Sequence, residues 1–251
     1  MSQIAINPPV CLAYISHEAE ADFLALSLEV MSSYDWITHI IVLHTDRDGT
    51  ERYINGAMHY YKDFGRGFES QPEHGGFHEL GARNALLDLA RKAGCPWILL
   101  CDPDEFFTPV TINCLRQAHD CKKQIVCFAC YHFVTPGSYV WWPDQVRLIQ
   151  SKQYHDPHVR AVLSDCNLIY RMNSNNRFRR HLKNRTMHCH LQWPAKTKRF
   201  HSQPETIYHV HVHHMLQPKR PSGVWLTRQE IRSDTAGIMP ENYIRVWEQQ
   251  S

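Results

Sequence analysis

Residues 97 to 107 carry the sequence Trp97-Ile98-Leu99-Leu100-Cys101-Asp102-Pro103-Asp104-Glu105-Phe106-Phe107. The stretch begins with an uninterrupted apolar run, which is typical of a parallel strand that is covered on both faces. The polarity then inverts, because three of the next four residues are carboxylates. Adjacent carboxylates repel and raise each other's pKa, and a divalent cation is the usual counter-ion. The stretch therefore predicts a metal site at the carboxyl end of a buried strand.

Strand-like and helix-like segments alternate before this stretch. An apolar run predicts a strand at 10–15, helical spacing predicts a helix at 19–31, and β-branched residues predict a strand at 37–44. Two strands joined by a helix form a βαβ unit, so the expected fold class is α/β with a mostly parallel central sheet flanked by helices. A second helix, expected at 77–93, leads into the strand that begins at Trp97.

The pattern after the acidic residues is less regular. The expected elements are a helix at 109–119, a strand at 124–133, a turn with exposed aromatic residues at 137–142, strands at 145–149 and 162–171, an irregular basic stretch at 172–203, an alternating strand at 207–213 and a helix at 238–251. On the alternating strand, His209, His211 and His213 share one face.

The bulk composition is that of a soluble globular protein. Of 251 residues, 43% are hydrophobic and 21% charged, and no apolar run approaches the roughly 20 residues that span a bilayer. We therefore expect no membrane insertion. The segment 1–9 lacks the features of a signal peptide, so we expect a cytoplasmic protein. The nine cysteines are expected to be reduced thiols, and Cys127 and Cys130, within an apolar run, are expected to pack in the core.

The net charge of +2 conceals an asymmetry. No acidic residue lies between Asp165 and Glu205. This gap holds the basic residues Arg171, Arg177, Arg179, Arg180, Lys183, Arg185, Lys196, Lys198 and Arg199. They either clamp donor phosphates or form a solvated loop, or they bind a polyanionic acceptor such as nucleic acid with the help of aromatic stacking.

Asp102 and Asp104 are two positions apart, so on an extended strand end their side chains project to the same side, while Glu105 turns aside. Oxygen ligands in this arrangement suit Mg²⁺ or Mn²⁺ bound together with a substrate diphosphate, because these ions keep positions open for phosphate oxygens. The alternative is a solvated acidic turn that caps the helix predicted at 109–119.

Three features follow one another in the sequence: a strand, helix and strand ending near Asp46, then Gly81-Ala82-Arg83-Asn84, and then Asp102-Pro103-Asp104-Glu105-Phe106. Over roughly residues 10 to 150, this order resembles that of family 2-like glycosyltransferases of the GT-A fold. Those enzymes have a DxD motif that is often followed by glutamate and phenylalanine. The resemblance implies one GT-A domain over 1–251, with a nucleotide-sugar-binding half at 10–135 and a smaller acceptor-binding half at 136–251.

The resemblance also implies roles for matching residues. Asp46 would meet the nucleotide base or ribose, Arg83 the diphosphate, Asp102 the ribose and the metal, and Asp104 the metal directly. A histidine from the C-terminal region often completes the metal shell in these enzymes, and our choice is His211. The segment after Asp46 departs from the sequence that is usual in the family, which weakens the assignment of Asp46.

An inverting transfer needs a general base, and the candidates are Asp144, which lies beside Trp142, and then Asp165. The candidate acceptor or phosphate contacts are Arg177, Arg179, Arg180 and Trp142.

The predicted activity is a metal-dependent transfer of a sugar from a nucleotide diphosphate sugar, a UDP-sugar in our reading, to an acceptor hydroxyl. The acceptor is a hydroxymethylated base in DNA, as for some viral enzymes that would act in the host cytoplasm, or else a glycan or a lipid-linked saccharide. Other readings left open are a His-rich metal-binding hydrolase, with zinc held by His209, His211 and Cys189, and a non-enzymatic nucleic-acid-binding module.

Overall fold

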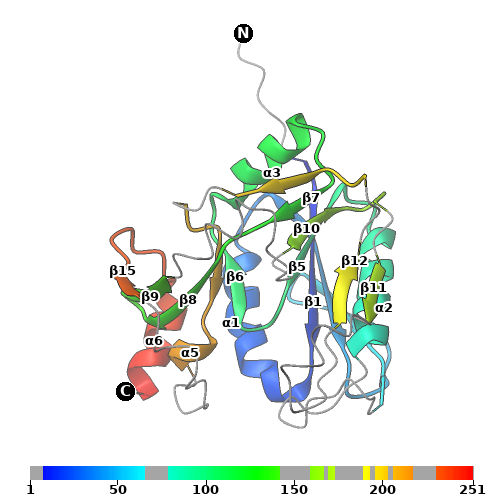
Figure 1. Ribbon diagram of the computed structural model, residues 1–251. Coiled ribbons are helices and arrows are strands. Elements are labelled where there is room, and N and C mark those ends of the chain that lie inside the picture. Colours follow the sequence, from blue (N-terminus) through cyan, green and yellow to red (C-terminus); the bar gives the residue numbers. More distant parts are fainter. Residues whose placement is uncertain are drawn as a thin grey trace, which may run out of the picture.

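The computed structural model describes residues 8–65, 79–141, 159–166, 169–172, 189–192, 196–202, 206–216 and 230–250. Its main sheet is built from β1 (Val10–Ser16), β2 (Ile37–His44), β3 (Arg52–Ile54), β4 (Ala57–Tyr61), β5 (Trp97–Cys101), β7 (Ile125–Cys127), β10 (Val159–Leu163) and β13 (Arg199–His201). The strand order is β13-β7-β10-β5-β1-β2-β4-β3. Figure 1 labels four neighbouring strands of this sheet, β7, β10, β5 and β1.

Parallel pairing dominates this sheet. β1 pairs in parallel with β2 and β5, β4 with β2, and β13 with β7. Only β10, which lies antiparallel to both β5 and β7, and the edge strand β3 break the pattern. The α/β class with a mostly parallel sheet is thus confirmed. Since β1, β2, β4 and β5 run the same way, the loops that follow them gather at one edge of the sheet.

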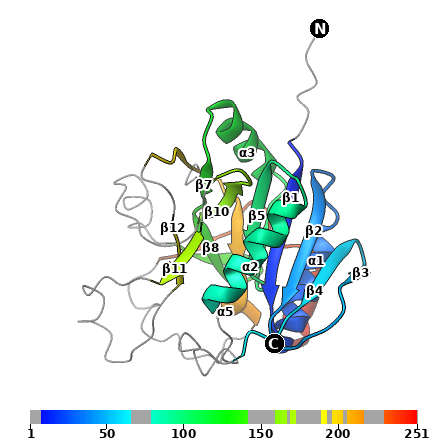
Figure 2. The same cartoon turned by 90° about the vertical axis from the view of Figure 1, so that its right-hand side faces the viewer.

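Helices cover both faces of the sheet. The short 3₁₀ turn η1 (Glu18–Glu20) leads into α1 (Ala21–Met31), whose Phe23 and Met31 belong to the same hydrophobic core cluster as Leu12 of β1. On the other face, α2 (Glu79–Lys92) packs Leu86 against Ala13. Figure 2 shows α2 in front of the strands and α1 behind them. Successive residues of β1 are therefore buried against opposite layers, which is why the strand is apolar throughout.

A second, five-stranded sheet lies beside the first (Figure 1). It consists of β15 (Glu230–Ser233), β9 (Ser138–Trp141), β8 (Cys130–Thr135), β14 (His209–His211) and β6 (Glu105–Phe107), in that order. Among the described elements, the chain crosses from the first sheet to the second between β5 and β6, between β7 and β8, and between β13 and β14. The acidic residues that follow β5 occupy the first of these crossings.

Several predicted boundaries were wrong, and pairing explains each case. The single strand expected at 124–133 is divided, because β7 pairs with β10 while β8 pairs with β14. The turn expected at 137–142 contains β9, which pairs with both β8 and β15. The strand expected at 162–171 is two strands, β10 and β11 (Ile169–Met172), and β11 pairs with β12 (Cys189–Gln192). The alternating strand at 207–213 is shortened to β14, because α5 (His213–Leu216) begins at His213.

The remaining helices match the predictions closely. They are α3 (Thr111–Asp120) and α6 (Glu241–Gln250). Cysteines whose side chains are described, Cys127 among them, are all free, as expected for reduced thiols. In the described part of the chain, no helix has both the length and the apolar character needed to cross a bilayer.

Candidate active site

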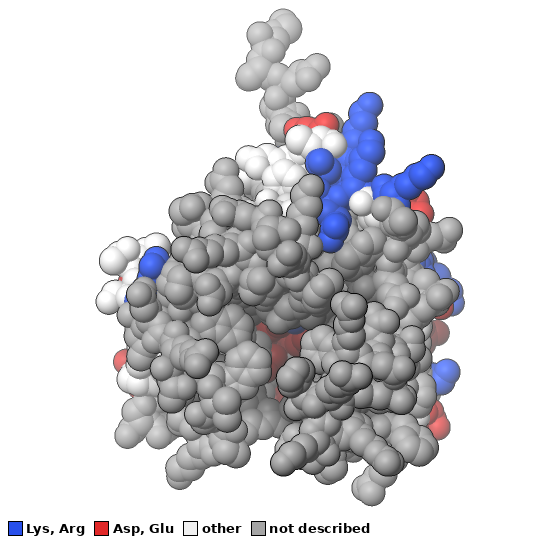
Figure 3. All heavy atoms as spheres, viewed as in Figure 1, with Lys and Arg blue, Asp and Glu red and all other residues white. Residues whose placement is uncertain are grey.

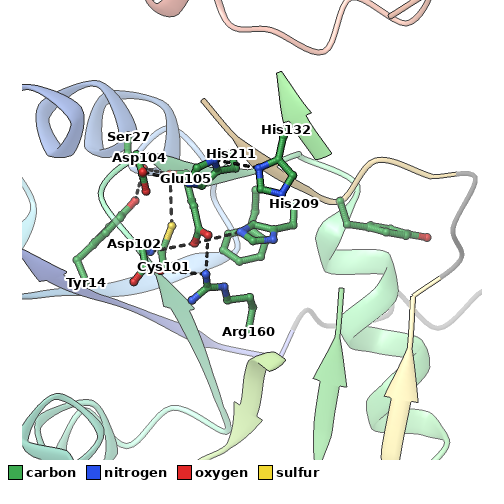
Figure 4. A network of polar contacts seen from close by, with 12 residues as sticks. Tyr14, Ser27, Cys101, Asp102, Asp104, Glu105, His132, Arg160, His209 and His211 are labelled. Carbon is green, nitrogen blue, oxygen red and sulfur yellow. Dashed lines mark hydrogen bonds and ion pairs between the residues drawn. The ribbon is translucent and has the colours of Figure 1, made fainter. Parts of the chain in front are cut away.

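The acidic residues lie in a tight turn between β5 and β6, at the carboxyl end of the parallel strands (Figure 4). The N–H of Glu105 donates to the carbonyl of Asp102 at 3.0 Å, which closes the turn. The carbonyl of Asp104 accepts the N–H of Val212 at 2.9 Å, so the turn is also fixed to the segment after β14. Acidic residues are visible within a recess near the middle of the face shown in Figure 3.

Asp102 lies between two guanidinium groups. Arg160 of β10 donates to one carboxylate oxygen at 2.9 Å, and Arg83 of α2 approaches the other at 3.5 Å. The Asp102 side chain is 25% exposed. Its charge is therefore compensated within the protein, while part of the carboxylate and Arg83 still face outward.

Glu105 is buried, with 2% of its surface exposed. One of its oxygens lies 2.5 Å from Nη2 of Arg160. The other lies 3.1 Å from Nε2 of the fully buried His209 and accepts the N–H of Asp102 at 3.1 Å. Burial alone would raise the pKa of Glu105, but the charges of Arg160 and then His209 outweigh it and hold that pKa below its usual value. Glu105 is thus an ionised structural group whose oxygens are occupied.

Asp104 has a different environment. Its carboxylate lies 3.1 Å from Nε2 of His211, and the two side chains are 17% and 20% exposed. Burial lowers the pKa of His211, but the charge and hydrogen bond of Asp104, followed by the charges of Glu105 and Asp102, overcome this effect and raise it to about 8. On its other side, Nδ1 of His211 lies 3.1 Å from Nδ1 of His132.

Another carboxylate near Asp104 and His211, that of Glu20, was not predicted. The pKa of Glu20, in η1 after β1, is raised to about 8 by burial and by the charges of Asp104 and Asp102, which Arg83 only partly offsets. Glu20 falls in the first turn of the helix predicted at 19–31, where an acidic side chain stabilises the N-terminus. The available signal was that it follows a parallel strand, at the same sheet edge as Asp102.

Asp46 also lies at this edge, directly after β2. Its side chain is exposed, and it accepts the N–H of Glu18 at 2.6 Å. The predicted donor-side residues Asp46, Arg83 and Asp102 therefore follow strands or begin a helix at the same end of the sheet.

Asp165 is not brought to the site. β10 runs antiparallel to β5 and pairs Leu163 with Trp97, and the N–H of Ser164 donates to the carbonyl of Pro96 at 2.9 Å. Asp165 thus lies beyond the start of β5, whereas Asp102 lies beyond its end. The other candidates Asp144, Trp142, Arg177, Arg179 and Arg180 fall outside the described residues.

The structure also corrects the prediction that His209, His211 and His213 lie on one strand. His209 and His211 are on β14 and both point toward the acids, but His209 is committed to Glu105, and His213 already belongs to α5. His211 faces Asp104.

The predicted metal ligands fit an ion only in part. Within the described ranges, no group of three or more His, Cys, Asp or Glu side chains is arranged to hold a metal. Asp102, Asp104 and His211 therefore do not form a common ligand set. The carboxylate of Asp102 is directed to the guanidinium groups of Arg160 and Arg83 instead. Asp104 and His211 do fit as a pair. Their 3.1 Å separation is close to the edge of about 3.0 Å expected for an octahedral ion with ligands at about 2.1 Å. Mg²⁺ and Mn²⁺ are commonly held by few side chains, with water and substrate phosphate completing the shell.

Comparisons with known proteins support a partial structural likeness. No protein-family model matches the chain, and no curated relative was found. A crystal structure of S. aureus TarS aligns at a TM-score of 0.47 with 9% identity, over 82% of this chain and 36% of that chain. A crystal structure of S. aureus TarS 1-349 aligns at 0.45 with 8% identity, over 83% of this chain and 61% of that chain. The mannosyltransferase PcManGT from Pyrobaculum calidifontis, in complex with GDP-Man and Mn²⁺, aligns at 0.40 with 13% identity, over 64% of this chain and 45% of its own. The chain spans less than two thirds of each of these structures, and at these scores the likeness does not decide an activity.

Proposed function

We propose that this chain is a divalent-metal-dependent glycosyltransferase of the GT-A type, which transfers a sugar from a nucleotide diphosphate sugar to an acceptor hydroxyl. The observation that carries the proposal is the pairing of Asp104 with His211 beside Asp102 and Arg83, at the carboxyl edge of a parallel sheet. Ligands of open α/β sheets bind at this edge. Three part-exposed carboxylates beside one histidine, those of Glu20, Asp102 and Asp104, favour a cation there.

Each residue has a distinct part in this proposal. Asp104 and His211 hold the cation, and Arg83 binds the donor diphosphate with a guanidinium that already points to Asp102. Asp102 contacts the ribose on the donor side, and Asp46 the base or ribose. A bound Mn²⁺ or Mg²⁺ supplies positive charge that stabilises the departing diphosphate.

Fewer observations support the assignments on the acceptor side. Asp144 remains the predicted general base, and Asp165 is not retained because it lies at the other end of β5. Inversion at the anomeric carbon, a uridine donor and a hydroxymethylated DNA base as acceptor stay predictions from the sequence, the last of them from Arg177, Arg179 and Arg180. A glycan or lipid-linked acceptor is the alternative.

A thermal-shift screen of nucleotide sugars, each with and without Mn²⁺, tests the proposal. A donor present at about 100 times its Kd adds about 2.7 kcal/mol to the free energy of unfolding. We expect one nucleotide sugar to stabilise the protein only when Mn²⁺ is present.

Asp104→Asn should abolish this Mn²⁺-dependent stabilisation and the slow hydrolysis of the donor, while the matched control Asp165→Asn should retain both. Metal-dependent donor binding that persists in Asp104→Asn would overturn the metal assignment. Stabilisation by no nucleotide sugar under any condition would overturn the proposed activity.

A further inference from the structure

His132 lies behind His211, on the side away from Asp104 (Figure 4). β8 and β14 pair in parallel, and their register places His132 next to His211. The two rings meet edge to face, with centroids 4.8 Å apart and planes at 66°. Their Nδ1 atoms are 3.1 Å apart, which is hydrogen-bond distance.

Two imidazole nitrogens at this distance bond only when one of them carries a proton and the other offers its lone pair. To coordinate a cation beside Asp104, His211 must present an unprotonated Nε2, so its own proton must lie on Nδ1. In that tautomer His211 donates from Nδ1, and Nδ1 of His132 must accept. His132 then carries its proton on Nε2.

We propose that His132 is a positioning residue for the cation site: it accepts the Nδ1–H of His211 and thereby fixes the tautomer and ring orientation in which Nε2 of His211 faces the cation. This inference rests on the proposed function, since it requires a cation at Asp104 and His211. Histidines that bind metals generally donate their second ring N–H to a partner, and loss of that partner weakens metal binding about 10- to 100-fold.

At this position a neutral ring suits the role of acceptor better than another carboxylate would. Glu20, Asp102, Asp104 and Glu105 already crowd this edge with negative charge. A neutral acceptor orients His211 without adding a fifth carboxylate, and the parallel pairing of β8 with β14 holds it in place.

The test is direct measurement of Mn²⁺ affinity by calorimetry or by the electron paramagnetic resonance signal of free Mn²⁺, on the full chain without donor. His132→Leu, which removes the acceptor, should weaken binding about 10- to 100-fold. His132→Asn, whose Oδ1 can take the place of Nδ1, should restore most of the affinity. His119→Leu, which removes an exposed imidazole from α3, should bind as the wild type does.

Nitrogen NMR of the Mg²⁺-loaded protein gives a second readout that a packing role would not affect. We expect His211 to carry its proton on Nδ1 in the wild type and in His132→Asn. Wild-type affinity in His132→Leu, or a Mg²⁺-loaded His211 protonated on Nε2, would overturn the inference. If instead the wild type and Asp104→Asn bind Mn²⁺ equally, the proposed metal site itself fails, and the inference fails with it.

Discussion

Asp104 and Glu105 are adjacent in the chain, yet they lie in opposite environments. Glu105 is buried and surrounded by Arg160, His209 and the N–H of Asp102. Asp104 is partly exposed and faces His211. The oxygens of Glu105 are occupied by the protein, whereas the Asp104 side chain keeps part of its surface in contact with solvent.

The difference teaches that an acidic motif cannot be interpreted from charge alone. Burial without a partner would cost several kcal/mol, so Glu105 requires Arg160 and His209. Asp104 is only partly buried, so water can still hydrate its carboxylate. Replacing a proton or a water molecule there by a cation therefore costs little free energy. The predictions below test this contrast between a structural half and a reactive half of the site.

The largest expected effect is on stability, from Arg160→Met. Removing one member of a buried ion pair leaves an uncompensated charge, so we expect the free energy of unfolding to fall by about 3 to 5 kcal/mol. Asp104→Asn, in the partly exposed half, should lower it by about 1 to 2 kcal/mol, because the contact with His211 is lost. Urea denaturation of both variants measures the contrast, and equal losses would show that the two halves do not differ.

A smaller effect should appear in the pH dependence of stability in EDTA. The pKa of His211 is raised to about 8 in the folded state, so its contribution is complete below the unfolded value of about 6.5. That contribution, about 1 to 2 kcal/mol, should disappear as the pH rises through about 8. The pKa of Glu105 is lowered by folding, so its contribution is complete at neutral pH and is lost in acid, as the pH falls below about 4.5.

The two halves should therefore fail at opposite ends of the pH scale. His211→Asn should reduce the loss between pH 6.5 and 8.5 and leave the acid limb unchanged, as followed by thermal unfolding at each pH. The loss that remains is assigned to Glu20, whose pKa is also raised to about 8. An alkaline limb of unchanged size in His211→Asn would show that His211 does not contribute to it.

The smallest effect is expected from Ser27→Ala. The Ser27 hydroxyl donates to the carbonyl of Glu105 at 2.6 Å and also contacts the hydroxyl of buried Tyr14 at 2.7 Å. Its loss should lower the free energy of unfolding by about 1 kcal/mol, because the Tyr14 hydroxyl loses that partner. Adding Tyr14→Phe should recover part of the loss, and Mn²⁺ affinity should stay within about twofold of the wild type.

Much of the scaffold could be predicted from the sequence. The strand predicted at 37–44 coincides with β2, and the apolar run from Trp97 is β5. These signals are local, because a buried parallel strand must be apolar along its whole length and a helix must repeat its apolar residues at its own period. The position of Asp102 and Asp104 after β5 followed from the same reasoning.

Tertiary structure alone decided which side chains meet. Arg160 reaches Glu105 across 55 residues of chain, and His132 reaches His211 across 79. No local pattern encodes these contacts, because they depend on β10 running antiparallel to β5 and on β8 lying next to β14. The same pairing moved Asp165 away from the acids and divided the strand predicted at 124–133. The sequence by itself determined that carboxylates would end a buried strand; the packing of distant strands determined that Glu105 would be enclosed and Asp104 left accessible.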